Sequence, residues 1–147
     1  MAAEIGFFHM ARHLRADLRV LLLADGPLVG RLHSAGSPVE VRDLDGALTA
    51  PRGGRDAPRE VRRYARAVGA LRRAVLEQVE QHDAGVVLLN SHRATRLAAA
   101  CALPRSRVRC MTMVRDGLRP PHLSRRDALV SQAAVNAVSS AVVANSR

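Results

Sequence analysis

Three short polar clusters contain side chains that could bind a ligand or take part in a reaction. Each cluster directly follows an apolar run that is typical of a strand. They are Asn90-Ser91-His92-Arg93, Arg115-Asp116-Gly117 and Asn145-Ser146-Arg147. Amides, hydroxyls and guanidinium groups bind sugar hydroxyls and phosphate oxygens well. At one shared edge, these clusters would form a cationic, hydrogen-bonding cleft for a hydroxyl-rich or phosphorylated ligand. The alternative is that they only cap strand ends, as polar residues do in any α/β protein.

The elements that would position these clusters alternate between helix and strand. Near-continuous apolar runs at 20–23, 86–89, 108–114 and 141–144 are typical of strands buried between helix layers. Helical spacing or helix signals predict helices over 4–18, 58–81, 94–103 and 125–139, the last with Ser124 as its N-cap. This alternation predicts an α/β fold with a parallel, doubly wound sheet, in which ligands bind beyond the carboxyl ends of the strands.

Apolar periodicity also predicts which helix faces are buried. In the 58–81 helix the expected inward stripe is Val61, Ala65, Val68, Leu71, Val75 and Val79. In the 125–139 helix the expected inward residues are Leu129, Val130, Ala133 and Val138.

The segment from Val20 to Leu44 has the most specific pattern. Its first strand ends at an Asp25-Gly26-Pro27-Leu28 turn that opens a helix of about two turns. Gly36 lies where a helix C-cap is expected, and a second strand follows from Val39. This is a compact parallel crossover unit.

Length and composition restrict the class of protein. The 147 residues fit one domain, and the charged 46–57 segment, which contains Pro51, Gly53 and Gly54, reads as a loop. Only three residues are aromatic, which argues against a base-stacking surface and makes nucleic acid an unfavoured partner. The net charge of +10 favours attraction to anionic membranes and phosphates.

Arginines on the 58–81 helix form a basic face, comprising Arg59, Arg62, Arg63, Arg66, Arg72 and Arg73. Three interpretations remain open: a solvated surface, contact with anionic lipid, or contact with nucleic acid.

Metal and disulfide chemistry are not expected. Cys101 and Cys110 match no metal spacing, and His9 and His13, although one helical turn apart, have no third ligand nearby in the sequence. A reducing cytoplasm is the expected compartment. No apolar run approaches the ~20 residues that cross a bilayer, so any membrane contact would be peripheral, at the inner face.

The chain resembles the N-terminal, acceptor-side domain of a family 4 glycosyltransferase with GT-B architecture. The matching pieces follow the family's order: Ala3-Glu4 opening a helix, Asp25-Gly26-Pro27-Leu28 with Leu32, Ala35-Gly36-Ser37-Pro38-Val39, Asn90-Ser91 after a strand, Val114-Arg115-Asp116, and Ala144-Asn145-Ser146. The resemblance covers nearly the whole chain. It implies a Rossmann-like sheet and transfer of a sugar from a nucleotide-sugar donor to an acceptor hydroxyl, without a bound metal.

The resemblance also implies roles for the polar clusters. Arg115 and Asp116 are the expected catalytic residues: Arg115 would face acceptor or phosphate oxygens, and Asp116 would orient it or accept a hydroxyl proton. A guanidinium stabilises anions but cannot act as a base near neutral pH, and many relatives carry a histidine near this point. The expected acceptor-binding residues, for a sugar or lipid-linked acceptor, are Asn90, Ser91, His92, Asn145 and Ser146. A structural salt bridge is the alternative for Arg115 and Asp116.

The sequence departs from that family at both ends. The family's first strand and glycine-rich loop have no counterpart before Ala3, and its donor-binding domain has none after Arg147. We therefore expect a partial glycosyltransferase domain over 1–147, inactive alone and holding no cofactor, with a gap or unusual pairing between the 20–23 and 86–89 strands. The alternative hypothesis is a small basic α/β module that acts through its arginine surface on anionic membrane or nucleic acid.

Overall fold

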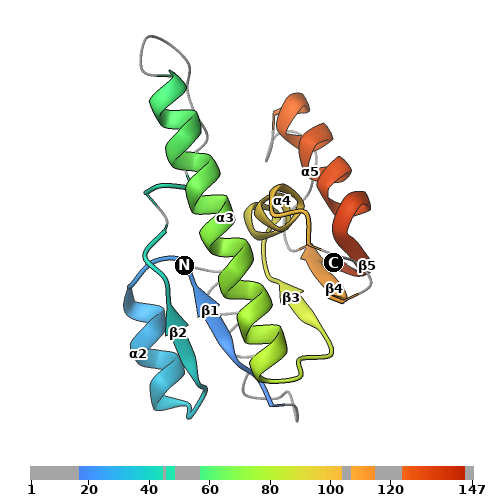
Figure 1. Cartoon of the computed structure of the whole chain (residues 1–147). Coiled ribbons are helices and arrows are strands. Elements are labelled where there is room, and N and C mark those ends of the chain that lie inside the picture. The colour runs from blue at the N-terminus through green and yellow to red at the C-terminus, as the bar shows by residue number, and fades with distance from the viewer. Residues whose placement is uncertain (1–16, 45, 49–56, 104–106, 115–123, 145–147) are drawn as a thin grey trace. The chain divides into compact units, whose positions relative to one another are not determined.

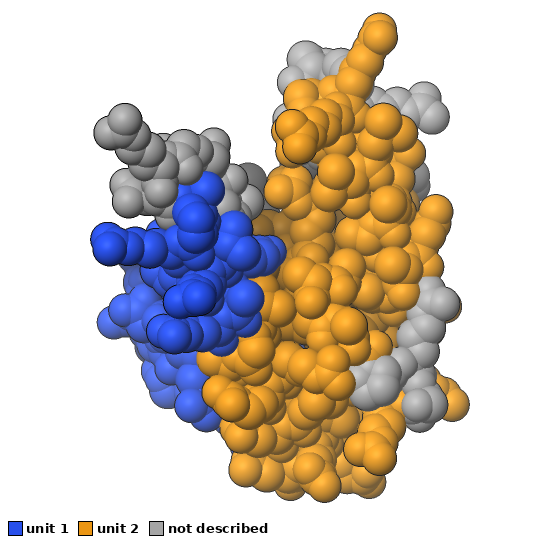
Figure 2. All heavy atoms as spheres, turned by 45° about the horizontal axis from the view of Figure 1, so that its top comes forward, with its two compact units in different colours: residues 1–67 blue, residues 68–147 orange. Residues whose placement is uncertain are grey.

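The computed structural model describes residues 17–44, 46–48, 57–103, 107–114 and 124–144 (Figure 1). The chain divides into two compact units, 1–67 and 68–147, which are coloured separately in Figure 2. Each unit is an α/β arrangement of parallel strands and helices, so the predicted fold class is confirmed.

The first unit contains the crossover predicted around the Asp25-Gly26-Pro27-Leu28 turn. Strand β1 (Val20–Leu22) pairs in parallel with β2 (Val39–Val41), and helix α2 (Pro27–Ser34) connects them. Pro27 occupies the first turn of α2, where its missing N–H costs no helical hydrogen bond. Leu32 is fully buried and anchors the helix in this unit.

Helix α2 ends in a Schellman motif. Gly36 has a positive φ of 75° and follows the C-cap residue Ala35. Its N–H donates to the His33 carbonyl at 2.9 Å, and the Ser37 N–H donates to the Leu32 carbonyl at 3.0 Å. These bonds satisfy carbonyls that the end of a helix leaves free, and the left-handed backbone they require favours glycine. Gly36 thus ends the helix as predicted, one position beyond the cap itself.

Helix α3 (Ala57–Gln81) is the longest element. Its buried residues are Ala67, Leu71 and Ala74. The predicted apolar stripe is correct at Leu71 but wrong at its beginning, where Val61 and Ala65 are exposed. Periodicity shows which side chains share a face, but it does not show whether another element covers that face.

The second unit is built on a three-stranded parallel sheet. Its order is β3 (Val87–Leu89), β4 (Cys110–Val114) and β5 (Ser139–Ala144). Helix α4 (His92–Ala100) connects β3 to β4, and α5 (Arg125–Val138) runs directly into β5 (Figure 1). A buried apolar cluster holds this unit together: Leu89, Ala98, Val108, Cys110 and Val138.

The inward face of α5 differs from the prediction. Val138 is buried as expected, but Leu129 and Val130 are 67% and 47% exposed, and Ala133 is exposed too. The helix instead buries Ala128, Ser131 and Ala134. Small side chains allow α5 to pack closely on α4, its main helical neighbour in this unit. The prediction was based on the hydrophobicity of the side chains, whereas the contact between α5 and α4 requires small side chains.

The strands do not form one continuous sheet within the described ranges. Strands β1 and β2 make one sheet, and β3, β4 and β5 make another. The gap or unusual pairing expected between the 20–23 and 86–89 strands stays a prediction, because these two strands belong to different units.

Candidate functional site

The carboxyl ends of β3, β4 and β5 meet at one edge of the second sheet. Val114 at the end of β4 is the register partner of Ala144 at the end of β5, and Leu89 at the end of β3 pairs with Thr112. Because all three strands are parallel, the chain leaves them on the same side. We call this the carboxyl edge.

The candidate residues that the structure describes at the carboxyl edge are Asn90, Ser91 and His92. All three are half-buried. Arg115, Asp116, Asn145 and Ser146 directly follow β4 and β5 in the sequence, but they lie outside the described residues. His9 and His13 also lie outside them.

Asn90 offers an unsatisfied acceptor. It is the first residue after β3, and its Oδ1 atom is buried without a hydrogen-bond partner in the described part of the chain. A buried polar atom without a partner costs about 1–3 kcal/mol, so such atoms are uncommon in folded proteins. A ligand hydroxyl that donated to this oxygen would remove that cost, once the groups that cover the atom move aside.

Ser91 has a structural role. Its Oγ accepts a hydrogen bond from the Ala94 N–H at 3.1 Å and caps α4, and its carbonyl accepts from the Thr95 N–H and Oγ1, both at 3.0 Å. Such a cap contributes about 1 kcal/mol. The cap begins α4 at His92, two residues before the predicted start, and holds Asn90 and His92 on either side of Ser91.

A chain of buried hydroxyls links α4, β4 and β5. The Oγ1 atoms of Thr95 and Thr112 are 3.4 Å apart, and Thr112 Oγ1 is 2.6 Å from Ser139 Oγ. Thr95 and Thr112 are almost fully buried. These residues were not predicted from the sequence. The signal in the sequence was that Thr95 is the one hydroxyl residue in an alanine-rich helix, and that Thr112 is the one hydroxyl residue in a strand, where it lies between two methionines.

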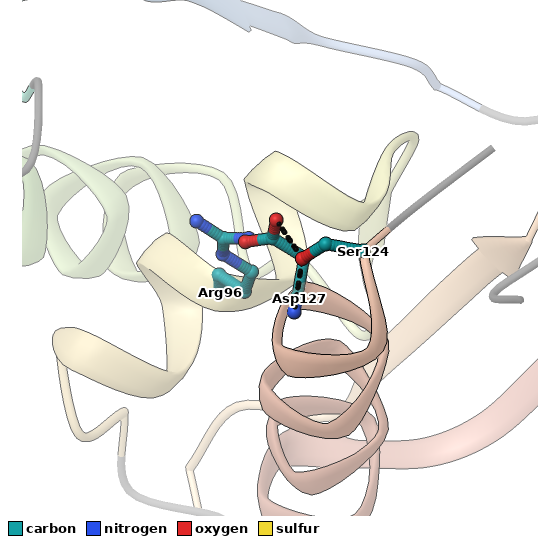
Figure 3. A network of polar contacts seen from close by, with 3 residues as sticks. All are labelled: Arg96, Ser124 and Asp127. Carbon is teal, nitrogen blue, oxygen red and sulfur yellow. Dashed lines mark hydrogen bonds and ion pairs between the residues drawn. The ribbon is translucent and has the colours of Figure 1, made fainter. Parts of the chain in front are cut away.

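A second polar network joins α4 to the start of α5 (Figure 3). Arg96 Nη1 donates to Asp127 Oδ1 at 3.3 Å, and Ser124 Oγ donates to Asp127 Oδ2 at 2.6 Å. The Ser124 hydrogen bond, followed by the nearby Arg96 and Arg126 charges, holds the pKa of Asp127 below its usual value. This network stabilises the helix start and the α4–α5 contact.

Neither cysteine is suited to nucleophilic chemistry. Burial raises the pKa of Cys101 to about 11, against a smaller lowering by Arg72, and burial also raises that of Cys110. Both thiols therefore stay protonated near neutral pH, and thiolate is the reactive form. Arg72 Nη1 donates to the carbonyls of Cys101 and Ala102, both at 3.0 Å, so Arg72 caps the end of α4.

The described ranges contain neither a cluster of metal ligands nor a membrane-spanning helix. No three His, Cys, Asp or Glu side chains among them lie close enough to hold a metal ion. None of the described helices combines the length and hydropathy needed to cross a bilayer.

Comparison with protein families, curated proteins and solved structures found no match to this chain.

Proposed function

We propose that this chain is the acceptor-side domain of a glycosyltransferase of the GT-B kind, which binds a hydroxyl-rich acceptor at the carboxyl edge. The observation that supports it best is the buried Oδ1 of Asn90, directly after β3, which has no hydrogen-bond partner among the described residues. A carboxamide oxygen is a natural acceptor for a sugar hydroxyl, and the sites of parallel α/β sheets lie at this edge. The order of the sequence motifs adds independent support.

In this proposal the carboxyl edge positions the acceptor. Asn90 accepts a hydrogen bond from an acceptor hydroxyl, and His92, at the start of α4, provides a second polar contact. Arg115 places its charge next to acceptor or phosphate oxygens, and Asp116 orients Arg115 or accepts the proton of the attacking hydroxyl. A nucleotide-sugar donor would be bound mainly by a second domain, and the domain described here would bind the acceptor.

Acceptor binding can be tested by titrating the chain with methyl mannoside, methyl glucoside and glucose 6-phosphate in a calorimeter. We expect saturable binding of at least one probe, weakened about tenfold in Asn90→Ala, the loss expected for one buried hydrogen bond. Asn136→Ala is the matched control, because Asn136 is an exposed carboxamide on α5. Equal affinities for the wild-type chain and Asn90→Ala would remove Asn90 from the site, and no saturable binding of any probe would oppose the proposal.

The catalytic assignment can be tested with this domain joined to a donor-binding domain. There, Arg115→Ala should lower turnover at least about tenfold while leaving the fold unchanged. Unchanged turnover would exclude Arg115 from the mechanism.

One observation favours a second candidate, peripheral binding to an anionic membrane from the cytoplasmic side. Arg59, Arg62, Arg63 and Arg66 are all exposed and recur at three- and four-residue spacing on the first turns of α3. Such a face attracts anionic headgroups, with about 1 kcal/mol per arginine near the surface. A lipid-linked acceptor would connect this candidate to the first.

Vesicle co-sedimentation tests membrane binding. We expect binding to vesicles of phosphatidylcholine with phosphatidylglycerol, little binding to phosphatidylcholine alone, and a decrease as salt rises. Arg62→Gln with Arg63→Gln should weaken binding, whereas the matched pair Arg125→Gln with Arg126→Gln on α5 should not. Equal loss in both double variants would show that net charge, not the α3 face, attracts the vesicles.

A further inference from the structure

Helix α5 and strand β5 expose an unusual share of the apolar side chains in the second unit. Six large apolar residues are exposed among the described ones, and four of them lie here: Leu129, Val130, Val142 and Val143. Neighbouring strand residues point to opposite faces of a sheet, so Val142 and Val143 leave β5 partly uncovered on both faces. A strand with exposed apolar side chains is open to contact with another chain.

Beyond the first turn of α5, this region carries no charged side chain. No residue from 128 to 146 is Asp, Glu, Lys or Arg, and this is the longest uncharged run in a chain with a net charge of +10. The rest of the sequence distributes 23 arginines and 13 acidic residues along the chain. A surface without charges in so basic a protein is suited to a partner that is itself uncharged at the contact.

Strand β5 is also an edge strand of the second sheet, which is a different feature from the carboxyl edge. It pairs with β4 on one side, and no described strand pairs with its other side. In a paired strand, backbone N–H and C=O groups of alternate residues point away from the neighbour, so a free edge presents unpaired groups. Natural edges are usually protected by lysine, proline or a bulge. β5 contains neither lysine nor proline, and beyond one irregularity near its start it pairs regularly with β4.

We propose that the edge of β5 with which no described strand pairs forms a strand pair with β5 of a second copy of this chain. The two strands run antiparallel about a twofold axis perpendicular to the sheet, and the two three-stranded sheets become one of six strands. The twofold axis passes at Val142, so the Val142 side chains of the two copies lie on the same face of the sheet and close together. Such an interface is closed, because each copy uses the same edge.

Charge favours a second copy over an acidic partner. Two chains of +10 repel each other, and the repulsion is smallest where they meet through segments that carry no arginine. An acidic protein or a membrane would instead be recognised by the arginine faces. The strand is also its own complement, since the same six uncharged residues supply both sides of the pairing.

Sedimentation velocity over a range of micromolar to millimolar concentrations tests the pairing. The wild-type chain should move from the single-chain mass of 15.9 kDa to twice that mass as concentration rises. Val142→Lys should stay at the single-chain mass, because lysines of the two copies would meet at the axis. Val61→Lys is the matched control, because Val61 on α3 is 52% exposed against 50% for Val142, and this variant should dimerise like the wild type.

Hydrogen exchange on the wild-type chain gives an independent readout that needs no variant to fold. The backbone amides of β5 should exchange more slowly in concentrated than in dilute solution, while those of β1 should not change. The proposal would be overturned by a single-chain mass at every concentration, by growth beyond the dimer, or by equal dimerisation of both lysine variants. It would also be overturned if the exchange rates of the β5 amides did not depend on concentration. The β5 edge does not include Asn90, so failure here leaves acceptor binding untouched.

Discussion

Ser124 and Asp127 form two hydrogen bonds with each other at the first turn of α5. The Ser124 hydroxyl donates to Asp127 Oδ2 at 2.6 Å, and the Asp127 N–H donates to Ser124 Oγ at 3.1 Å. The carboxylate also lies where the helix dipole favours negative charge. The pair therefore begins the helix, and Arg96 connects it to α4.

Replacing Ser124 with alanine should lower the free energy of unfolding by about 1 kcal/mol, the usual value of an N-cap. Chemical denaturation of wild type and variant at neutral pH measures it. Ser140→Ala is a suitable control because Ser140 is an exposed serine in β5 outside any helix cap. An unchanged midpoint in Ser124→Ala would show that the cap contributes nothing.

The pKa of Asp127 gives the network a pH dependence. Because the folded pKa is lowered from 3.8, the carboxylate stabilises the fold above that pH and loses the contribution as pH falls through the folded value. Asp127→Asn should therefore reduce the loss of stability in acid. Thermal unfolding from pH 6 to pH 2 measures this as a smaller acid-induced drop in Tm, and parallel Tm curves would contradict it.

Replacing Ser131 with alanine should change the free energy of unfolding in the opposite direction to replacing Ser124. Ser131 is 1% exposed, and its Oγ has no partner in the described part of the chain. Ser131→Ala removes an unsatisfied hydroxyl and improves helix propensity, so we expect a gain of about 1 kcal/mol in the free energy of unfolding. Urea unfolding of the two alanine variants side by side checks the sign. A loss of stability in Ser131→Ala would mean that the hydroxyl is bound.

Ala102 has a left-handed backbone just after α4, with φ of 46°. This conformation costs a residue with a Cβ atom about 1 kcal/mol, so Ala102→Gly should raise the free energy of unfolding by about that amount. Ala100→Gly, two residues earlier and inside α4, should lower it by about 1 kcal/mol. Thermal unfolding distinguishes the two, and equal shifts of Tm would contradict the assignment.

Thr112 is the middle of the buried hydroxyl chain. Thr112→Val keeps the side-chain shape but leaves Ser139 Oγ without its 2.6 Å partner, so a loss of about 1–2 kcal/mol is expected. Adding Ser139→Ala should cost less than the sum of the two single changes, because the orphaned hydroxyl is then removed. A double-mutant cycle by denaturation measures the coupling, and strict additivity would show that the contact carries no energy.

Local signals in the sequence predicted local structure well. Gly36 indicated the end of α2, Pro27 its first turn and Ser124 the start of α5, because turns and caps depend on a few adjacent residues. The parallel strand segments were predicted by their apolar runs. Their bounds moved by a few residues, and β5 begins at Ser139 directly after α5.

Features that depend on distant partners were not predicted. The exposed Leu129 and the buried Ser131 follow from how closely α5 packs on α4, which hydrophobic periodicity does not contain. The Thr95–Thr112–Ser139 chain joins three elements separated in sequence. At the candidate site, the end of the predicted 86–89 strand indicated the position of Asn90, but not its unsatisfied oxygen or the capping role of Ser91.

Chemical-shift mapping tests the acceptor-binding proposal most directly. A labelled chain is titrated with methyl mannoside, methyl glucoside and glucose 6-phosphate, and the amide signals are followed. We predict that the bound probe shifts the backbone amides of Asn90, Ser91 and His92 and the side-chain amide of Asn90, and leaves β1 and β2 unchanged. Shifts confined to the first unit, or no saturable shift at the carboxyl edge with any of the three probes, would contradict the account.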